Sequence, residues 1–411
     1  MSSRVIAFTS ITSNYIPKAR VLAGSIKKIA PSVQFHLVLA DDLPVGFDLD
    51  QEPFDSVIYA ESLPIPNKTG WLFSHTVVEL CTAVKGIAAE KIFEDLAADK
   101  VFYFDPDVVV FSRLDELCKK LDEYSVLLTP HLTDPETSVA GINDNEMAAL
   151  IHGVFNLGFV GIRNDKEGRR FSRWWTDRLL FFCHDDIPRG LFTDQKWVNL
   201  APCFFDRVHV LRSPAFNVAT WNISKRKATG SVAGGVYVNG EPLGFYHFSG
   251  LDSGAQELML HKYGGDSPVL FDLRDWYIRA CEAAGQSVLG KIPYKFAFFD
   301  DGSPVGRDHR VLYRQREDLQ KAYRNPFSTV GDGGYKAWYG QNAPSVQESY
   351  RVLSIRPCAG LTDVLTDLAT YFRVVAYSER ARHPLKRFSL RLGAVGLGWV
   401  VRIVRWARWN R

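Results

Sequence analysis

Cysteine pairs and long apolar runs are both missing from this sequence of 411 residues. The six cysteines are scattered and none forms a CxxC pair, which argues against a thiolate zinc site and against a disulfide framework. No apolar stretch approaches the roughly 18 residues that are needed to span a bilayer. The opening run RVIAFTS reads as a strand, so we expect no secretory signal. These absences favour a cytoplasmic protein with reduced thiols, either soluble or peripheral to a membrane.

Several common motifs of nucleotide-binding proteins and hydrolases are missing as well. The sequence has no GxxxxGK[ST] phosphate loop, no GxGxxG after its first predicted strand and no GxSxG elbow. These absences argue against P-loop kinases, dinucleotide-binding enzymes and serine hydrolases. The net charge of +3 is too small to indicate a protein that binds nucleic acid, and we expect no such partner.

The remaining composition is that of an ordinary globular protein, 46% hydrophobic and 23% charged, in which strand and helix patterns alternate. This alternation is typical of an α/β fold, whose open sheet binds ligands at the carboxyl ends of its strands. Asn239-Gly240, between two β-rich runs, predicts a hairpin turn. The first predicted segments are strand 5–11, a helix with Pro17 near its start, strands 34–42 and 56–63, helix 74–96 capped by Ser74 or Thr76, and strand 101–104.

The run VFYFDPDVVVF, residues 101–111, carries two carboxylates at its midpoint. Proline removes a ladder donor, so the buried strand should end before Pro106. In extended backbone Asp105 and Asp107 point the same way, and two adjacent carboxylates repel unless a positive charge lies between them. A hard divalent cation such as Mg²⁺ or Mn²⁺ would fit, since both favour oxygen ligands. The alternative is a plain turn, in which Asp and Pro are both common.

Six segments, taken in order, resemble a known enzyme family. They are VIAFTS…YIPKARVLAGSI, FHLVLADD, VFYFDPDVVVF, FNLGFVGIR, FTDQKW and FYHFSG, and they span about residues 4 to 250. This order resembles nucleotide-sugar glycosyltransferases of the GT-A fold, most closely the relatives of glycosyltransferase family eight. The resemblance implies that Asp105, Asp107 and His247 hold Mn²⁺ or Mg²⁺ against the donor diphosphate. The alternative for His247 is a histidine buried in a strand between Tyr246 and Phe248.

The resemblance also implies a set of donor-binding residues. The alternative for Asp42 is a plain aspartate at a strand end, and the alternative for Arg20 and Lys85 is a solvated surface charge. The set comprises Thr9, Ser10 and Tyr15 lining the nucleoside pocket, Asp42 at the base or ribose, Arg20 and Lys85 at the phosphates, and Asn156 and Asn222 near sugar hydroxyls.

Asp194 and Gln195, in FTDQKW, match the acceptor-side pair of the family. A carboxylate and an amide can both orient a hydroxyl nucleophile at the anomeric carbon, which would make them the catalytic pair. The alternative is that Thr193 or Asp194 caps the helix that follows. After His247 the sequence departs from the family, because HFSGLDSGAQ lacks the expected lysine. Lys262 could substitute for it, which leaves the residue that covers the diphosphate unassigned.

We therefore expect a hexosyltransferase-type enzyme of polysaccharide biosynthesis, with a mixed α/β sheet of GT-A (Rossmann-like) type and a helical C-terminal extension. It would move a sugar from a nucleotide donor (a UDP-sugar) to a hydroxyl of a glycan or lipid-linked glycan. The resemblance implies retention of configuration; the alternative is inversion, which needs a general base, for which Asp194 could serve. Two other classes stay open. A sugar-nucleotidyltransferase would release pyrophosphate from a sugar phosphate and UTP. A non-catalytic, membrane-docked scaffold with a vestigial pocket would not hydrolyse a nucleotide sugar at all.

The expected domains are a catalytic domain over residues 1–255, a helical extension over 256–327, and a linker with a basic amphipathic segment over 328–411. No acidic residue follows Glu379, whereas arginines and tryptophans recur to the C-terminus. A basic helix of this kind is typical of an interfacial anchor, which would place the protein peripherally on the inner face of the cytoplasmic membrane. The alternative is a helix that packs on the catalytic domain with its arginines solvated.

Overall fold

The computed structural model describes residues 3–330 and 334–342. In this part of the chain a seven-stranded sheet has the order β10-β6-β7-β4-β1-β2-β3. Neighbouring strands are parallel except where β7 pairs antiparallel with β4 and with β6, so the sheet is mixed. Its strands are β1 (Val5–Ile11), β2 (Gln34–Leu39), β3 (Ser56–Tyr59), β4 (Lys100–Phe104), β6 (Val126–Pro130), β7 (Phe155–Arg163) and β10 (Val208–Val210).

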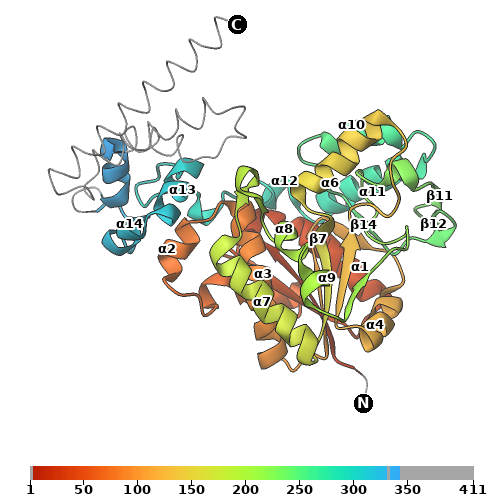
Figure 1. Ribbon diagram of the computed structural model, residues 1–411, viewed down its shortest axis with the longest axis horizontal. Helices are drawn as coiled ribbons and strands as arrows, with labels where there is room; N and C mark the ends of the chain where they lie inside the picture. Colours follow the sequence, from red (N-terminus) through yellow and green to blue (C-terminus); the bar gives the residue numbers. More distant parts are fainter. Residues whose placement is uncertain (1–2, 331–333, 343–411) are drawn as a thin grey trace, which may run out of the picture. The chain divides into compact units, whose positions relative to one another are not determined.

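Long helices cover both faces of this sheet. The strands β1, β4 and β7 are buried along almost their whole length, as expected for strands that are covered on both faces. One face is covered by α1 (Ile16–Ile29) and α4 (Leu114–Glu123), whose apolar side chains pack on β1, β2 and β4. Helices α3 (Val77–Asp95) and α7 (Lys166–Phe182) lie side by side (Figure 1). Their close approach requires Gly86, where a Cβ atom would lie 2.8 Å from the Cα atom of Thr176.

Local sequence signals explain where several elements begin and turn. Thr76 caps α3 and forms a reciprocal capping box with Glu79, which selects Thr76 from the two predicted caps. Pro17 lies in the first turn of α1, where its missing N–H is not needed. Asn239 (φ 49°) and Gly240 (φ 87°) form the predicted two-residue turn between β12 (Gly235–Val238) and β13 (Glu241–Pro242).

Smaller sheets and short helices surround the central sheet in the described chain. The pair formed by β5 (Val108–Val110) and β14 (Phe245–His247) brings distant parts of the sequence together. The other short strands are β8 (Asp185–Asp186), β9 (Leu191–Phe192), β11 (Ala228–Ser231), β12 (Gly235–Val238) and β13 (Glu241–Pro242). The short helices before β14 are α2 (Lys68–Phe73), α5 (Val139–Gly141), α6 (Met147–His152), α8 (Gln195–Val198) and α9 (Ala201–Phe204).

Helices follow β14, as expected for a helical C-terminal extension. They are α10 (Ala255–Tyr263), α11 (Val269–Ala283), α12 (Gln286–Leu289), α13 (Arg307–Gln315) and α14 (Glu317–Ala322). The expected fold class, a mixed α/β sheet flanked by helices and followed by helices, is therefore confirmed. The chain divides into two compact units, residues 1–320 and 321–411, while the functional domain boundaries stay a prediction. The basic C-terminal segment lies outside the described residues.

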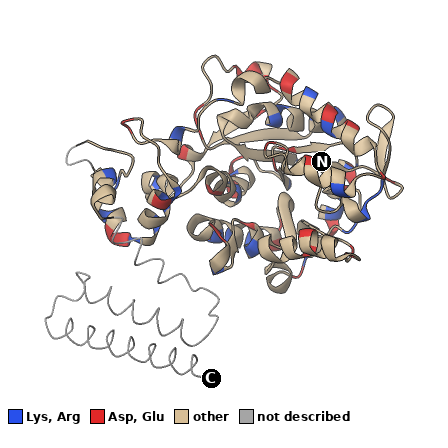
Figure 2. Ribbon diagram, turned by 90° about the horizontal axis from the view of Figure 1, so that it is seen from above, with Lys and Arg blue, Asp and Glu red and all other residues tan. Residues whose placement is uncertain are grey.

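Charged residues of both signs are interspersed on the helices and loops around the sheet (Figure 2). The strands β1 and β2 carry none, and β4 and β7 carry one each, Lys100 and Arg163. Among the residues described, no helix combines the length and the apolar character that crossing a membrane requires. Asp105 and Asp107 follow β4, one of these nearly uncharged strands, at the point where it ends.

Candidate active site

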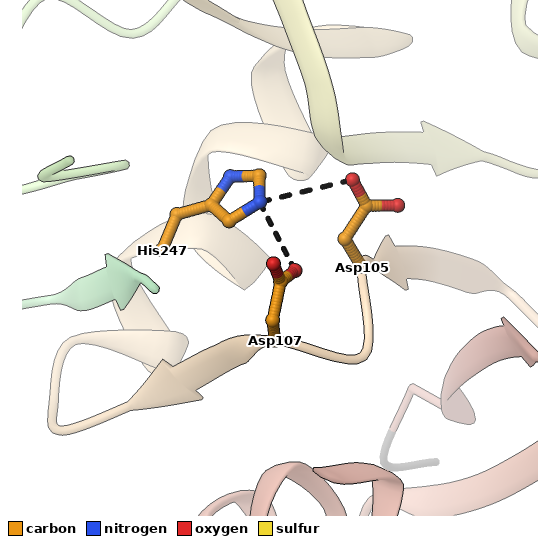
Figure 3. A group of neighbouring side chains, drawn as sticks. All are labelled: Asp105, Asp107 and His247. Atoms are coloured by element: carbon orange, nitrogen blue, oxygen red, sulfur yellow. Dashed lines mark ion pairs between the residues drawn. The ribbon is translucent and has the colours of Figure 1, made fainter. Parts of the chain in front are cut away.

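Asp105, Asp107 and His247 meet where β4 ends (Figure 3). The chain leaves the sheet after Phe104, passes Pro106 and re-enters a strand at Val108, as the sequence predicts. The His247 Nε2 atom lies 3.1 Å from Asp107 Oδ1 and 3.9 Å from Asp105 Oδ2. One ligand atom from each of the three side chains lies within 4.8 Å of the others. Three side chains from two distant segments thus converge on one point.

Backbone hydrogen bonds fix the chain at these three residues, and the His247 N–H donates to the Val218 carbonyl at 2.8 Å. The Asp105 N–H donates to the carbonyl of Gly158 at 2.8 Å, and the Phe248 N–H donates to the carbonyl of Asp107 at 2.8 Å. Gly158 is also required by the histidine, because a Cβ atom there would lie 2.5 Å from the His247 Cε1 atom. Backbone pairing therefore determines where the three side chains lie.

The donor set fits a divalent cation. His247 Nδ1 lies 3.2 Å from the Asn156 amide oxygen, to which it donates, and this leaves Nε2 facing the two carboxylates. Burial raises the pKa of Asp107, but the adjacent imidazole lowers it below the ordinary value. Burial lowers the pKa of His247, but Asp107 and Asp105 raise it above the ordinary value. An imidazolium can therefore balance the carboxylates, and a bound cation would replace its proton.

Lys85 connects this cluster to Asp194. Its Nζ atom lies 3.1 Å from Asp194 Oδ2 and 3.3 Å from Asp105 Oδ1, and it donates to the Leu157 carbonyl at 3.1 Å. Burial alone would lower the pKa of Lys85, but the two carboxylates raise it. Burial raises the pKa of Asp194, partly offset by Lys85. The Lys85 side chain is only 5% exposed, so the alternative of a solvated surface charge is wrong.

The expected acceptor-side pair is buried beside the cluster. Asp194 occupies the N-cap position of α8, yet its side chain makes no capping hydrogen bond within the described chain and turns to Lys85 instead. The Gln195 side-chain oxygen accepts from Asn156 Nδ2 at 3.0 Å and from the Leu157 N–H at 3.2 Å. Asn156 therefore contacts both Gln195 and His247, and links the two expected groups.

Two further asparagines, Asn217 and Asn222, form hydrogen bonds that hold Asn156 and the loop next to it. Asn217 has a left-handed backbone (φ 52°) and donates to Asn156 Oδ1 at 3.1 Å. Asn222 accepts from the Ala219 N–H at 3.0 Å and donates to the Asn217 carbonyl at 3.0 Å. Asn222 thus holds the loop that carries Asn217. Sequence reasoning missed Asn217, although Asn is the usual non-glycine residue at positive φ.

The expected nucleoside side lies at the ends of β1 and β2. The hydroxyls of Thr9 and Ser10 are buried, and neither has a hydrogen-bond partner among the described residues. Asp42, the residue expected from the sequence, is 66% exposed and pairs with Lys295. Its neighbour Asp41 turns inward, and burial raises the pKa of its carboxyl group. Sequence reasoning missed Asp41, because only the register at the end of β2 decides which of two adjacent aspartates faces inward.

The remaining predicted cations and Tyr15 have partners of their own. Tyr15 donates to Asp252 Oδ2 at 3.0 Å. Arg20 pairs with Glu52, its Nε atom donating at 2.7 Å, and it is not brought to the carboxylate cluster. Lys262 pairs with Asp144 on the surface. The structure therefore gathers the metal set, Lys85, Asn156 and the Asp194-Gln195 pair, and separates Arg20 and Lys262 from them.

No family model matches the chain. It is 34% identical to the uncharacterized protein YfnD of Bacillus subtilis over 222 residues, 53% of this chain and 68% of that protein. It is 26% identical to the uncharacterized protein YfnF of the same organism over 174 residues, 42% of this chain and 56% of that protein. The chain thus spans little more than half of YfnF.

Solved structures to which the chain is similar include several glycosyltransferases. The galactosyltransferase LgtC, in complex with donor and acceptor sugar analogues, is 16% identical with a TM-score of 0.40, over 70% of this chain and 97% of LgtC. GlyE of Streptococcus pneumoniae is 17% identical with a TM-score of 0.37, over 73% of this chain and 67% of GlyE. Mouse xyloside xylosyltransferase 1 is 13% identical with a TM-score of 0.35, over 61% of this chain and 98% of that protein. At these scores the likeness by itself assigns no activity.

Proposed function

The chain belongs to the same family as YfnD of Bacillus subtilis, and we propose that it is a metal-dependent glycosyltransferase of GT-A type. The single observation that carries this proposal is the convergence of Asp105, Asp107 and His247 at the carboxyl end of β4. In an open α/β sheet this edge is where ligands bind, and the arrangement is the one that the resemblance to glycosyltransferase family eight implies.

Asp105, Asp107 and His247 would hold Mn²⁺ or Mg²⁺, which would neutralise charge that develops on a departing nucleoside diphosphate. Asn156 fixes the imidazole so that Nε2 faces the site, and this tautomer is the one that binds a cation. The hydroxyls of Thr9 and Ser10, which have no partner in the described part of the chain, are suited to a nucleoside, since buried polar groups normally find a partner. The proposed nucleoside is uridine, and the proposed donor is a UDP-sugar.

Asp194 and Gln195 would define the acceptor side, where a sugar hydroxyl is oriented toward the anomeric carbon. Lys85 holds the Asp194 carboxylate at 3.1 Å, which favours a fixed, ionised group. The proposed outcome is retention of configuration. The acceptor is a glycan or lipid-linked glycan hydroxyl, as in polysaccharide biosynthesis, and the basic C-terminal segment would bring the enzyme to the inner face of the membrane.

The test is hydrolysis of UDP-sugars by the full chain without acceptor, with Mn²⁺ present or chelated. We expect slow release of UDP that requires the cation and is lost in Asp107→Ala. The matched control is Asp115→Ala, because Asp115 is an exposed aspartate on α4. Release of pyrophosphate from a sugar phosphate and UTP would instead identify a nucleotidyltransferase. A chain that neither binds nor cleaves any nucleotide sugar would contradict the proposal.

A further inference from the structure

Lys18 is a buried cation in the first turns of α1, only 3% exposed. Its Nζ atom lies 2.5 Å from Asp252 Oδ2, and 4.3 Å from the centre of the Tyr15 ring. The same Asp252 oxygen accepts from the Tyr15 hydroxyl at 3.0 Å. A buried ammonium group requires a counter-ion, and here one exposed carboxylate supplies it.

This ion pair lies beside the candidate metal site. Helix α1 packs on β5, where the Val110 N–H donates to Ser25 Oγ at 3.1 Å, and β5 begins directly after Asp107. The Lys18 partner, Asp252, lies four positions after Phe248, whose N–H donates to the Asp107 carbonyl at 2.8 Å. A diphosphate bound to a cation at Asp107 would therefore reach the surroundings of Lys18.

Asp252 lies in the short loop that follows β14. The loop leaves His247 through Phe248, whose N–H donates to the Asp107 carbonyl at 2.8 Å. Left-handed glycines, Gly250 (φ 79°) and Gly254 (φ 77°), lie on either side of Asp252. Among the described residues, the other hydrogen bonds of the loop are local, such as Gly254 N–H to the Leu251 carbonyl at 3.3 Å. Little besides the contact with Lys18 and Tyr15 holds the Asp252 carboxylate in this position.

The side chain of Asp252 is 56% exposed, whereas that of Lys18 is 4% exposed. Moving a mostly solvated carboxylate fully into water costs little free energy. Leaving a buried ammonium group without a counter-ion costs much more. A phosphate oxygen offers the same charge and acceptor geometry as a carboxylate oxygen, so it can replace Asp252 without leaving Lys18 unpaired.

We propose that Lys18 is a diphosphate-binding residue of this site and that Asp252 is its counter-ion only until a donor phosphate displaces it. This inference rests on the proposed function and adds to it a specific phosphate contact. It makes opposite predictions for the two partners of one ion pair. Removing Lys18 removes a phosphate contact, while removing the Asp252 charge removes a competitor of the phosphate.

The experiment measures the dissociation constant of UDP for the full chain with Mn²⁺ by calorimetry. For Lys18→Met we expect binding weaker by about tenfold or more, the usual cost of a lost charged hydrogen bond. For Asp252→Asn we expect binding tighter by roughly three- to tenfold, because phosphate no longer competes with a carboxylate. The control is Lys27→Met, which removes another 2.5 Å lysine–aspartate pair from the same helix and should leave the dissociation constant unchanged.

Two outcomes overturn this inference while leaving the proposed function standing: unchanged UDP affinity in Lys18→Met, or weaker affinity in Asp252→Asn. The second outcome would mean that Asp252 positions Lys18 and does not compete with phosphate. If Lys18→Met does not fold, Asp252→Asn decides the question, since the Asn side chain keeps an oxygen that can accept a hydrogen bond from Lys18. A wild-type chain that binds no UDP with Mn²⁺ would overturn both the proposed function and this inference.

Discussion

Lys85 and Asp194 form a 3.1 Å ion pair in which neither side chain is more than 5% exposed. The same ammonium group lies 3.3 Å from Asp105, one of the proposed metal ligands. A single buried cation therefore joins the proposed donor side of the site to its proposed acceptor side. The network has a structural cost as well as a proposed catalytic purpose, because buried charges are stable only when they are paired.

Replacing Lys85 with methionine should destabilise the protein, because it leaves the buried Asp194 carboxylate without its partner. Breaking one side of a buried pair costs about 3–5 kcal/mol of unfolding free energy. Chemical denaturation measures the change, and the double variant Lys85→Met/Asp194→Asn should recover much of it. An unchanged unfolding free energy in Lys85→Met would mean that water or a cation already compensates Asp194.

Replacing Asp194 with alanine should separate donor binding from transfer. We expect the affinity for UDP to remain nearly unchanged, while transfer falls by about a hundredfold, a typical cost of lost positioning. The isosteric Asp194→Asn variant is the control for packing. A variant that loses UDP affinity to the same degree would place Asp194 on the donor side. A variant that unfolds would give it a structural role through Lys85.

The buried histidines predict a loss of stability in mild acid. Burial lowers the pKa of His75 and of His131 to about 4, and that of His184 to about 3. In the unfolded chain these groups take up protons near their ordinary pKa of about 6.5, so the unfolded state binds more protons below that pH. The unfolding free energy should therefore fall as the pH drops from about 6.5 toward 4. Urea denaturation measures this slope.

The variant His75→Asn separates the contribution of this histidine to the pH dependence of stability from the contribution of the carboxylates. His75→Asn keeps a donor for the Trp71 carbonyl, to which His75 Nδ1 lies at 2.7 Å. Its unfolding free energy should depend less on pH between about 6.5 and 4 than that of the wild type. Equal slopes in the two proteins would mean that His75 is not held neutral in the fold.

The basic C-terminal segment should bind anionic membranes. Basic residues near an anionic surface contribute about 1 kcal/mol each. We expect the full chain to sediment with anionic vesicles and not with neutral ones, and a truncation ending near Arg382 to lose this binding. Equal pelleting of the two proteins with anionic vesicles would contradict the membrane proposal.

Local sequence signals were sufficient to predict much of the fold. Pro106 marks where β4 must end, because it cannot donate to the sheet, and Asn239-Gly240 marks a turn that needs two positive φ angles. Gly158, whose lack of a Cβ atom permits close approach, is the residue that admits the His247 ring. Each of these signals depends on the geometry of a few neighbouring residues.

Contacts between distant segments could not be predicted in this way. Lys18 and Asp252 are 234 positions apart, and a lysine in a helix has the same local pattern whether it is buried or solvated. Lys85 shows the same limit, since its two carboxylate partners come from β4 and from the start of α8. The choice of Asp41 over Asp42 as the inward carboxylate depends on the register of a strand end, which no local pattern states.

The most direct test of the account is the manganese-dependent affinity for UDP, measured by calorimetry on the wild type, Asp105→Ala and Asp107→Ala. We expect the wild type to bind UDP tightly only when Mn²⁺ is present, and both variants to lose this dependence while they keep their folded circular dichroism spectrum. Unchanged manganese-dependent affinity in both variants would contradict the assignment of these carboxylates, and with it the proposed function.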